Sequence, residues 1–368
     1  MRRTFKYKAK INKTTEKNAL HWLDLCRNLY NAALEQRIYV YQQHKKSLYL
    51  YDQSKQLPDL KNNISEYKQV DAQCLQDVLG RLERSYQHFF RRVKTKIGKP
   101  GFPRFKGKNR YDSFTLHHNS WKLDNKYLHI RNVGTFKLFL SRPIQGKIKT
   151  VTIQRTKTNE WFVSFSCDDV PMKLYPKTDQ SVGIDVGTKN FSTDSDGKTF
   201  ENHRYLKQSL ALLRRRQRAL SRKVKGSNRR NKTRILVAKT HQKVVNQRND
   251  FLYKTANYYI NNYQNIYVEQ MNIQKLLKNK YHSQSILDAS WGRFFAILSY
   301  KAEEAGRKFA KVSCQDTSVK CSNCSESVIK KTLNARFHKC PACKVKLDRD
   351  FNASLNILRL GQSLQAST

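Results

Sequence analysis

The sequence predicts an α/β multi-domain protein, in which an N-terminal β-barrel with a helical insertion precedes an α/β domain that carries an inserted four-cysteine zinc ribbon. Three observations support this fold class. Short segments with a period of two fill much of the first half, and short apolar strands alternate with long helical stretches in the second half. Two CxxC pairs stand near the end. The 368 residues suffice for two or three domains.

The charge of the chain indicates the class of its partner. Lysine and arginine number 72 against 28 acidic residues, a formal net charge of +44. Such self-repulsion favours a polyanionic partner, usually nucleic acid, although ribosome-like and membrane-surface proteins share this charge. No apolar run approaches the roughly 18 residues that span a bilayer, and no signal-peptide core is visible. We therefore expect no membrane partner and no small-molecule substrate.

The barrel is predicted from two separate segments. Residues 1–12 alternate apolar and basic side chains, as a half-buried strand does. Residues 101–175 contain six short alternating segments, and residues 158–160 form a hairpin turn between the last two. We expect the first strand to return to this small antiparallel barrel.

The helical insertion is predicted between these two segments, at residues 13–100. Apolar stripes with helical spacing indicate one helix from about residue 15 to 41 and a second from about 65 to 96. The charged side chains on the outer face of the second helix are nearly all basic. A solvated surface explains them as readily as contact with nucleic acid does.

Residues 176–313 predict the first part of the α/β domain. The short apolar strand VGIDVG holds Asp185, and a hairpin closed at Asp196 and Gly197 follows it. The later strand NIYVEQMN holds a single carboxylate, Glu269.

Helices are predicted between and after these strands. Residues 205–263 form a basic helical hairpin that is interrupted near Gly226. A helix from 289 to 306 and a strand that ends at Cys314 lead into the zinc ribbon.

The zinc ribbon is predicted at residues 314–347. Each CxxC pair chelates from one tight turn, and four thiolates complete a tetrahedron around one structural Zn²⁺. His338 is an alternative ligand. Residues 348–360 complete the α/β domain, and residues 361–368 are a polar tail. The predicted ligands are Cys321, Cys324, Cys340 and Cys343. The eight cysteines do not resemble a secreted disulfide framework, which favours a reducing compartment.

Three carboxylates are candidates for a catalytic site. Asp185 and Glu269 follow apolar strand residues, where a charge is costly without a partner. If their strands are parallel neighbours, both emerge at one edge of the sheet, and Asp350 at a helix start can join them. Each alone also fits a cap or a turn. Together they would repel without a cation, and oxygen ligands suit one or two Mg²⁺ ions in phosphodiester cleavage.

The order of these elements resembles the RNase H-like fold of RuvC-type nucleases. The chain also resembles the TnpB family of insertion-sequence proteins, which are related to compact type V CRISPR effector nucleases. The resemblance runs from about residue 5 to 358, and its motifs are GIDVGTKNF, LSRKVKGSNRRNKTR, HQKVVNQRNDFLYK, DASWGRFF, DRDFNASLNIL, LQDVLGRLERSYQHFFRRVK and KPGFPRFK.

This resemblance implies an RNA-guided DNA endonuclease with a wedge-like barrel and a helical recognition insertion. It assigns catalysis to Asp185, Glu269 and Asp350, with Asp350 preferred over Asp348 because it stands two residues before Asn352. A guide RNA would pair with one strand of double-stranded target DNA while the protein reads a short adjacent motif. We expect a monomer in the cytoplasm of a prokaryotic cell, associated with the nucleoid.

Nucleic-acid contacts are assigned more coarsely. The resemblance suggests four readers of the adjacent motif, which are Tyr51, Gln73, Gln76 and Thr115. Basic segments suggest phosphate contacts at Arg84, Arg91, Arg92, Arg104, Lys106, Arg214, Arg218, Arg222, Lys223, Lys225, Arg229 and Arg230.

The chain departs from the family pattern in the zinc ribbon. The family usually has glycine directly after each CxxC, where this sequence has Ser325 and Lys344, so strain is expected in both turns.

Two other functions share the motifs: a guided DNA-binding regulator without cleavage, and a transposase or transposition accessory. A regulator is expected to lose a carboxylate, and this chain retains all three.

Overall fold

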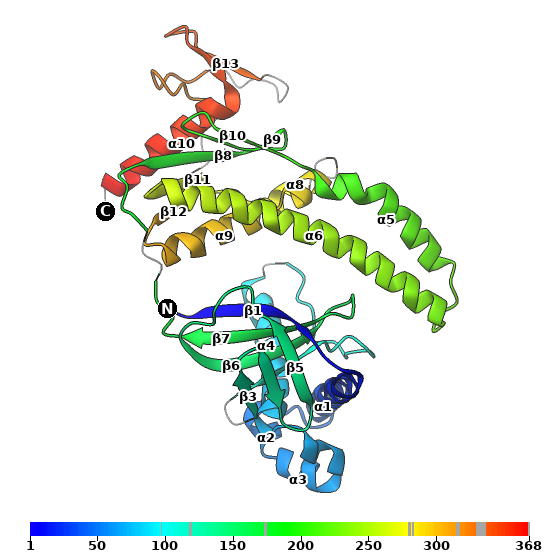
Figure 1. Ribbon diagram of the computed structural model, residues 1–368. Coiled ribbons are helices and arrows are strands. Elements are labelled where there is room, and N and C mark those ends of the chain that lie inside the picture. Colours follow the sequence, from blue (N-terminus) through cyan, green and yellow to red (C-terminus); the bar gives the residue numbers. More distant parts are fainter. Residues whose placement is uncertain are drawn as a thin grey trace. The chain divides into compact units, whose positions relative to one another are not determined.

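The computed structural model describes residues 1–366 except 97, 118–119, 173–174, 279–280, 282, 314–316 and 329–335, so the expected strand end at Cys314 lies outside the described residues. The chain forms two compact units, Met1–Pro171 and Met172–Thr368 (Figure 1). The sequence placed this boundary between residues 175 and 176. Within the described residues, none of the helices combines the length and the apolar character that a membrane crossing requires.

The first unit is built on a seven-stranded antiparallel sheet with the order β2-β6-β7-β1-β5-β4-β3. The first strand of the chain lies between two late strands, as expected, with Phe5 opposite Phe165 and Ala9 opposite Leu138. Its strands are β1 (Arg3–Lys10), β2 (Ser113–Leu116), β3 (Trp121–Asp124), β4 (Tyr127–Ile130), β5 (Gly134–Phe139), β6 (Lys147–Arg155) and β7 (Trp161–Asp168).

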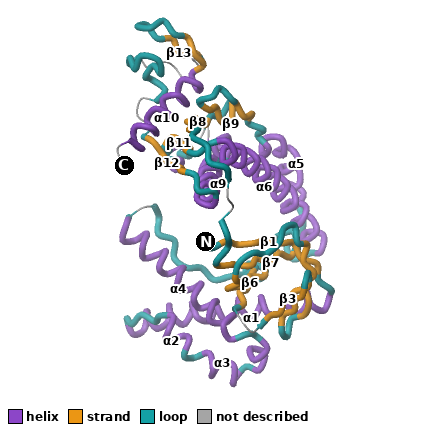
Figure 2. Tube along the Cα trace, turned by 60° about the vertical axis from the view of Figure 1, so that its left-hand side comes forward, coloured by secondary structure: helices purple, strands orange, loops and turns teal. Residues whose placement is uncertain are grey.

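The helices of the first unit share one core with this sheet, and Figure 2 shows them in purple. The helix predicted from about residue 65 is wrong at its start. A 3₁₀ helix occupies Ser65–Gln69, Val70 is extended, and Asp71 caps a new helix by accepting a hydrogen bond from Cys74 N at 3.0 Å. The helices are α1 (Lys13–His44), α2 (Leu50–Ser54), α3 (Leu57–Asn63) and α4 (Ala72–Thr95).

The second unit is built on a five-stranded sheet with the order β10-β9-β8-β11-β12. β11 pairs in parallel with both β8 and β12, whereas β9 is antiparallel to β8. The sheet is therefore mixed, and it contains both the parallel pair and the antiparallel hairpin that the sequence suggested. Its strands are β8 (Ser181–Val186), β9 (Asn190–Asp194), β10 (Thr199–Glu201), β11 (Asn265–Glu269) and β12 (Lys308–Val312).

Helices cover both faces of this sheet (Figure 1). Residues of α6 and α9 form the main core on one face, while α10 lies along β8 on the other. α10 continues through residues 361–366, which the sequence analysis treated as a tail. The remaining elements are α5 (Tyr205–Ser221), α6 (Asn228–Asn262), α7 (Ile273–Leu276), α8 (Ser283–Ala289), α9 (Trp291–Glu304), α10 (Arg349–Ala366), β13 (Phe337–Lys339) and β14 (Lys346–Asp348).

Two glycines allow α10 to approach the sheet closely. A Cβ on Gly183 in β8 would overlap the helix backbone at Ser354 and Leu358, and a Cβ on Gly361 would overlap the ring of Tyr267. Any larger residue at either position forces the helix away from the strands. The separation between α10 and the sheet therefore depends on these two positions.

We expect Gly183→Ala to destabilise the second unit by about 1–3 kcal/mol, the usual cost of overpacking. Gly80→Ala in α4 is the matched control, because nothing lies within 4 Å of its added Cβ and alanine favours a helix interior by up to about 1 kcal/mol. Calorimetric unfolding measures both changes. An unchanged transition for Gly183→Ala would show that α10 does not pack closely on β8.

Candidate active site and metal centre

The alternation of side chains along β8 and β11 directs two carboxylates to one face of the sheet. Ile184 and Val268 are register partners that enter the core beneath α6 and α9. Asp185 and Glu269, one position further on, therefore point to the opposite face. That is the face covered by α10, and both carboxylates are half-buried there. The parallel pairing of the two strands, on which the sequence-based placement of these residues depended, is present.

The third carboxylate, Asp350, arrives from the first turn of α10. Its Oδ2 lies 3.8 Å from the point where a Cβ on Gly187, just after β8, would stand. Asp348 has a different role, because its Oδ1 accepts hydrogen bonds from the N–H groups of Asp350 (2.9 Å) and Phe351 (3.3 Å). Asp348 is thus the N-cap of α10, and Asp350 is the carboxylate that reaches the sheet edge.

Burial acts on all three carboxylates, and repulsion by the other two acts on Asp185. Burial raises the pKa of Asp185 well above its usual range, and the negative charges of Asp350 and Glu269 raise it further. Burial also raises the pKa values of Glu269 and Asp350. The ionised forms of these carboxylates are therefore disfavoured when no cation is near. A hard divalent cation prefers oxygen ligands and would compensate their negative charge.

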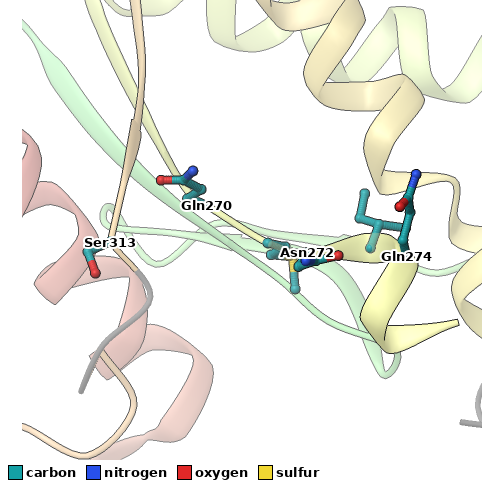
Figure 3. Close-up of a pocket in the computed structure, with 6 residues that line it drawn as sticks. Gln270, Asn272, Gln274 and Ser313 are labelled. Carbon is teal, nitrogen blue, oxygen red and sulfur yellow. The ribbon is translucent and has the colours of Figure 1, made fainter. Parts of the chain in front are cut away.

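A pocket of about 460 Å³ opens directly after Glu269, within the range of roughly 300–1,000 Å³ that ligand sites have. Figure 3 shows Gln270, Asn272, Gln274 and Ser313 around it. The N–H of Gln270 donates to Val312 O at 2.8 Å, which fixes the end of β11 against β12. Amide and hydroxyl side chains, together with Met271 and Ile273, therefore border a hollow at the end of β11.

The four predicted zinc ligands come together in the structure. Their sulfur atoms all lie within 4.8 Å of one another, with Cys321 and Cys343 at 3.6 Å and Cys324 and Cys340 at 3.5 Å. A tetrahedron with Zn–S bonds of about 2.3 Å has S–S edges of about 3.8 Å. Within the described residues, this is the one set of three or more histidine, cysteine or acidic ligands as close as that. The thiols are therefore compatible with a zinc site, and His338 is not among the four.

Each CxxC pair lies on the same kind of turn. Ser325 N donates to Cys321 O at 2.9 Å, and Lys344 N donates to Cys340 O at 3.1 Å. Ser325 and Lys344 have φ values of 66° and 62°, in the left-handed region where a side chain costs roughly 1–2 kcal/mol. The absence of the family glycines thus strains both turns, as the sequence predicted. A hydrogen bond from the backbone of Val345 lowers the pKa of Cys343 to about 6, which favours the thiolate.

Two buried asparagines of α10 fasten the first of these turns to the helix. Asn352 Oδ1 accepts from Ser322 N at 2.9 Å, and its Nδ2 donates to Lys320 O at 2.9 Å. Asn356 Nδ2 donates to the same Lys320 carbonyl at 2.8 Å. One turn of helix separates the two asparagines, so both lie on one face. These hydrogen bonds therefore connect the four-cysteine centre to the helix that carries Asp350. The sequence analysis missed this connection, although the two asparagines of the motif DFNASLN were a signal for it.

The proposed motif-reading residues are distributed over the first unit. Gln73 and Gln76 are exposed on the first turns of α4, and Tyr51 on α2 is 69% exposed. Thr115 is engaged internally, because Arg81 Nη2 donates to its Oγ1 at 2.9 Å. Gln73, Gln76 and Tyr51 thus face solvent, whereas Thr115 lies within a hydrogen-bonded network.

The side chains of two of the twelve proposed phosphate contacts already bind a carbonyl or a carboxylate inside the protein. Arg230 Nη1 donates to the carbonyls of Leu220 and Lys223, both at 2.9 Å, and so closes the turn between α5 and α6. Arg84 lies 3.3 Å from Asp77. The other ten are exposed or half-exposed: Arg91, Arg92, Arg104, Lys106, Arg214, Arg218, Arg222, Lys223, Lys225 and Arg229.

The arginines of α5 line a groove of about 540 Å³. Arg214, Arg218 and Arg222 are four residues apart and exposed on one side of the helix, and Ala211 and Ala219 leave room between them. This spacing presents a row of guanidinium groups, which bind phosphate oxygens well.

A buried carboxylate that the sequence analysis did not single out anchors this helix. Asp288 of α8 accepts hydrogen bonds from Leu206 N at 3.0 Å and Lys207 N at 3.2 Å, and it pairs with Arg248 of α6 at 2.8 Å. It therefore caps the N-terminus of α5 from another helix and joins three helices. Its position in the motif DASWGRFF was the signal available in the sequence.

Comparisons with known proteins agree with this arrangement. A family model described as "Probable transposase" matches residues 164–280, and one described as "Cas12f1-like, TNB domain" matches residues 291–357. The chain is 29% identical to a "Putative RNA-guided DNA endonuclease" of Streptomyces pristinaespiralis, covering 100% of this chain and 91% of that protein. It is 27% identical to "Putative RNA-guided DNA endonuclease InsQ" of Escherichia coli (strain K12), covering 98% and 93%.

A solved structure shares the fold. The protein chain in "Cryo-EM structure of the Cas12f1-sgRNA-target DNA complex" aligns with a TM-score of 0.55 at 16% identity, covering 94% of this chain and 82% of that chain. At this identity the likeness supports the fold class.

We expect Lys344→Gly to tighten zinc binding by about 1 kcal/mol. The change removes a left-handed non-glycine residue, and the larger backbone entropy of glycine offsets part of the gain. Competition with a chelator measures the zinc affinity. Ser325→Gly is the matched comparison, and its gain should be smaller because Ser325 Oγ accepts a hydrogen bond from Arg359 at 2.6 Å. Weaker zinc binding by Lys344→Gly would contradict this account of the strain.

Proposed function

We propose that this chain, which belongs to the TnpB family, is an RNA-guided endonuclease that cuts double-stranded DNA beside a short recognised motif. The observation that carries the proposal is the convergence of Asp185, Glu269 and Asp350 at one sheet edge. The names of the full-length relatives support the same activity. A guide RNA would supply most of the sequence specificity, and basic surfaces would hold the nucleic acid through its backbone.

The proposed catalytic group is the three carboxylates, which would hold one or two magnesium ions. When bound, magnesium activates a water and stabilises the leaving oxygen of a phosphodiester. Asp185 and Glu269 come from neighbouring parallel strands, so the sheet fixes their separation. Asp350 depends on α10, whose first turn is capped by Asp348. The four-cysteine centre holds its zinc away from the reaction, with a structural role.

Guide RNA and target DNA also imply where the protein works. We propose that it acts as a monomer at the nucleoid of a prokaryotic cell, since its substrate would be genomic or element DNA. Mass measurement of the purified complex tests the stoichiometry, and imaging of a fluorescent fusion with a DNA stain tests the location. A dimer, or exclusion from DNA, would contradict the respective part.

The nuclease test uses the purified chain with the RNA that it carries and a duplex that matches this guide. Asp185→Ala, Glu269→Ala and Asp350→Ala should each reduce magnesium-dependent cleavage by roughly 100-fold or more, because several kcal/mol of charge stabilisation are lost. RNA binding should persist in all three.

Asp348→Asn is the matched control for Asp350→Ala. Asparagine also caps helices, and the loss of the Asp348 charge removes one cause of the raised pKa of Asp350. Cleavage by this variant should stay close to that of the unchanged chain. A different outcome would support a DNA-binding regulator instead. In that case the unchanged chain would bind the guided duplex but cleave it no more than Asp185→Ala does.

The groove on α5 can be tested through the salt dependence of RNA affinity. Replacing Arg214, Arg218 and Arg222 together by glutamine should reduce the slope of log K against log salt by about 2 to 3, because each lost phosphate contact removes about 0.7–0.9. Arg2→Gln is the control, since Arg2 pairs with Asp168 at 2.6 Å on another part of the chain. An unchanged slope in the triple variant would exclude the groove as a phosphate site.

A further inference from the structure

A group of aromatic side chains, of which Tyr86 and Phe89 are half-buried and the others exposed, lies at the end of α4 and on the segment that follows it. Phe89 lies 5.2 Å from Phe90 and 5.3 Å from Phe102 between ring centroids, and Tyr86 lies 5.6 Å from Phe102. Phe90 is 57% exposed, Phe102 46% and Phe105 55%. We call these five residues the aromatic platform. Large aromatic rings left in water at this density mark a binding surface.

The charge around the aromatic platform is of one sign. Residues 84–111 contain ten lysines and arginines and no aspartate or glutamate. Arg91 and Arg92 are exposed beside Phe90, and Arg92 Nη1 lies 3.7 Å from the point where a Cβ on Gly101 would stand. The guanidinium of Arg92 therefore lies against the segment that carries Phe102. A cation-rich aromatic surface suits a ligand that is both anionic and flat.

The segment that carries Phe102 and Phe105 is held in place. Asn31 of α1 donates from Nδ2 to Lys106 O at 3.0 Å, and its Oδ1 accepts from Lys106 N at 2.7 Å. The ammonium of Lys106 lies 5.3 Å from the ring centroid of Tyr30. On the α4 side, the rings of Phe102 and Tyr86 meet edge to face. Because hydrogen bonds fix the backbone at Lys106 and a ring contact holds Phe102, little ordering entropy is lost when a ligand binds.

We propose that the aromatic platform stacks unpaired bases of a single-stranded segment of nucleic acid. Successive bases stack on aromatic rings without regard to sequence, while neighbouring arginines contact the phosphates. A second copy of the chain is disfavoured as the occupant, because two such faces would bring Arg91, Arg92 and Arg104 of each copy together. The inference rests on the proposed function only in that the chain binds nucleic acid; it does not require cleavage.

The test measures the affinity of full-length protein, freed of bound nucleic acid, for fluorescent single-stranded RNA and DNA over a range of salt. Phe90→Leu and Phe105→Leu should each weaken binding by about 5-fold or more at every salt concentration, with the slope against salt unchanged, because stacking releases no counterions. If the variants lose affinity for RNA alone or for DNA alone, the result identifies which kind of single strand is bound. Either result supports the proposal.

Two comparisons make the result specific. Phe139→Leu, on β5, removes a phenylalanine that is 52% exposed outside the aromatic platform, and it should leave the affinity unchanged. Arg91→Gln with Arg92→Gln should instead reduce the salt slope by about 1 to 2. Phe90 and Phe105 are both exposed, and a thermal melt checks that their variants fold.

Several outcomes would overturn the proposal. Equal affinity of the platform variants and Phe139→Leu would remove stacking as a contribution. Equal losses on fully paired duplexes would show a role that does not need unpaired bases. A nucleic-acid-free protein that is a dimer, and that Phe90→Leu or Phe105→Leu converts to a monomer, would assign the surface to contact between copies. Asp350→Ala separates this result from the nuclease proposal, since that variant should lose cleavage and retain base stacking.

Discussion

The candidate active site depends on the contact between α10 and the sheet of the second unit. Asp185 and Glu269 are placed by two paired strands, but Asp350 is 81 residues beyond Glu269 in the chain and reaches them only through its helix. Gly183 and Gly361 allow that helix to lie against the strands. Once the helix is seated, the first turn of α10 brings Asp350 to the end of β8, where the strand carboxylates emerge. One packing distance therefore sets the position of Asp350 relative to the two strand carboxylates.

The metal centre holds the same helix from its other side. Asn352 and Asn356 bind the backbone of the turn that carries Cys321 and Cys324, and both asparagines are almost fully buried. The turns are strained by non-glycine residues at positive φ, and these hydrogen bonds offset part of that strain. The ribbon is consequently more than an appended module. Its fold and the position of Asp350 are coupled through two side chains, so in the proposed nuclease a zinc ion held by the four thiols would act on cleavage through α10.

The sequence revealed the parts of this site that follow from local pattern. Short apolar strands with one carboxylate each predicted where Asp185 and Glu269 emerge, and the CxxC spacing predicted the four thiols. The asparagine contacts to Lys320 and the cap that Asp288 provides for α5 were not predictable, because they join elements that are distant in sequence. The start of α4 was missed for a different reason. The apolar stripe continues through Val70 and Cys74, and periodicity alone does not register that the chain becomes extended at Val70 and that Asp71 caps the next helix.

Binding and cutting have opposite electrostatic requirements in this molecule. The chain carries a net charge of +44, and its exposed arginine rows attract a phosphate backbone whatever its sequence. The proposed catalytic edge is acidic, and burial raises the pKa values of its three carboxylates. The charges of Asp350 and Glu269 raise the pKa of Asp185 further. Without a cation this edge repels the phosphate that it is proposed to cut. Nucleic acid can therefore be held by the basic and aromatic surfaces alone, whereas cleavage also needs the charge of the acidic edge to be reversed. This separation follows from the charge distribution, and it makes guided binding and guided cutting physically distinct properties of one chain.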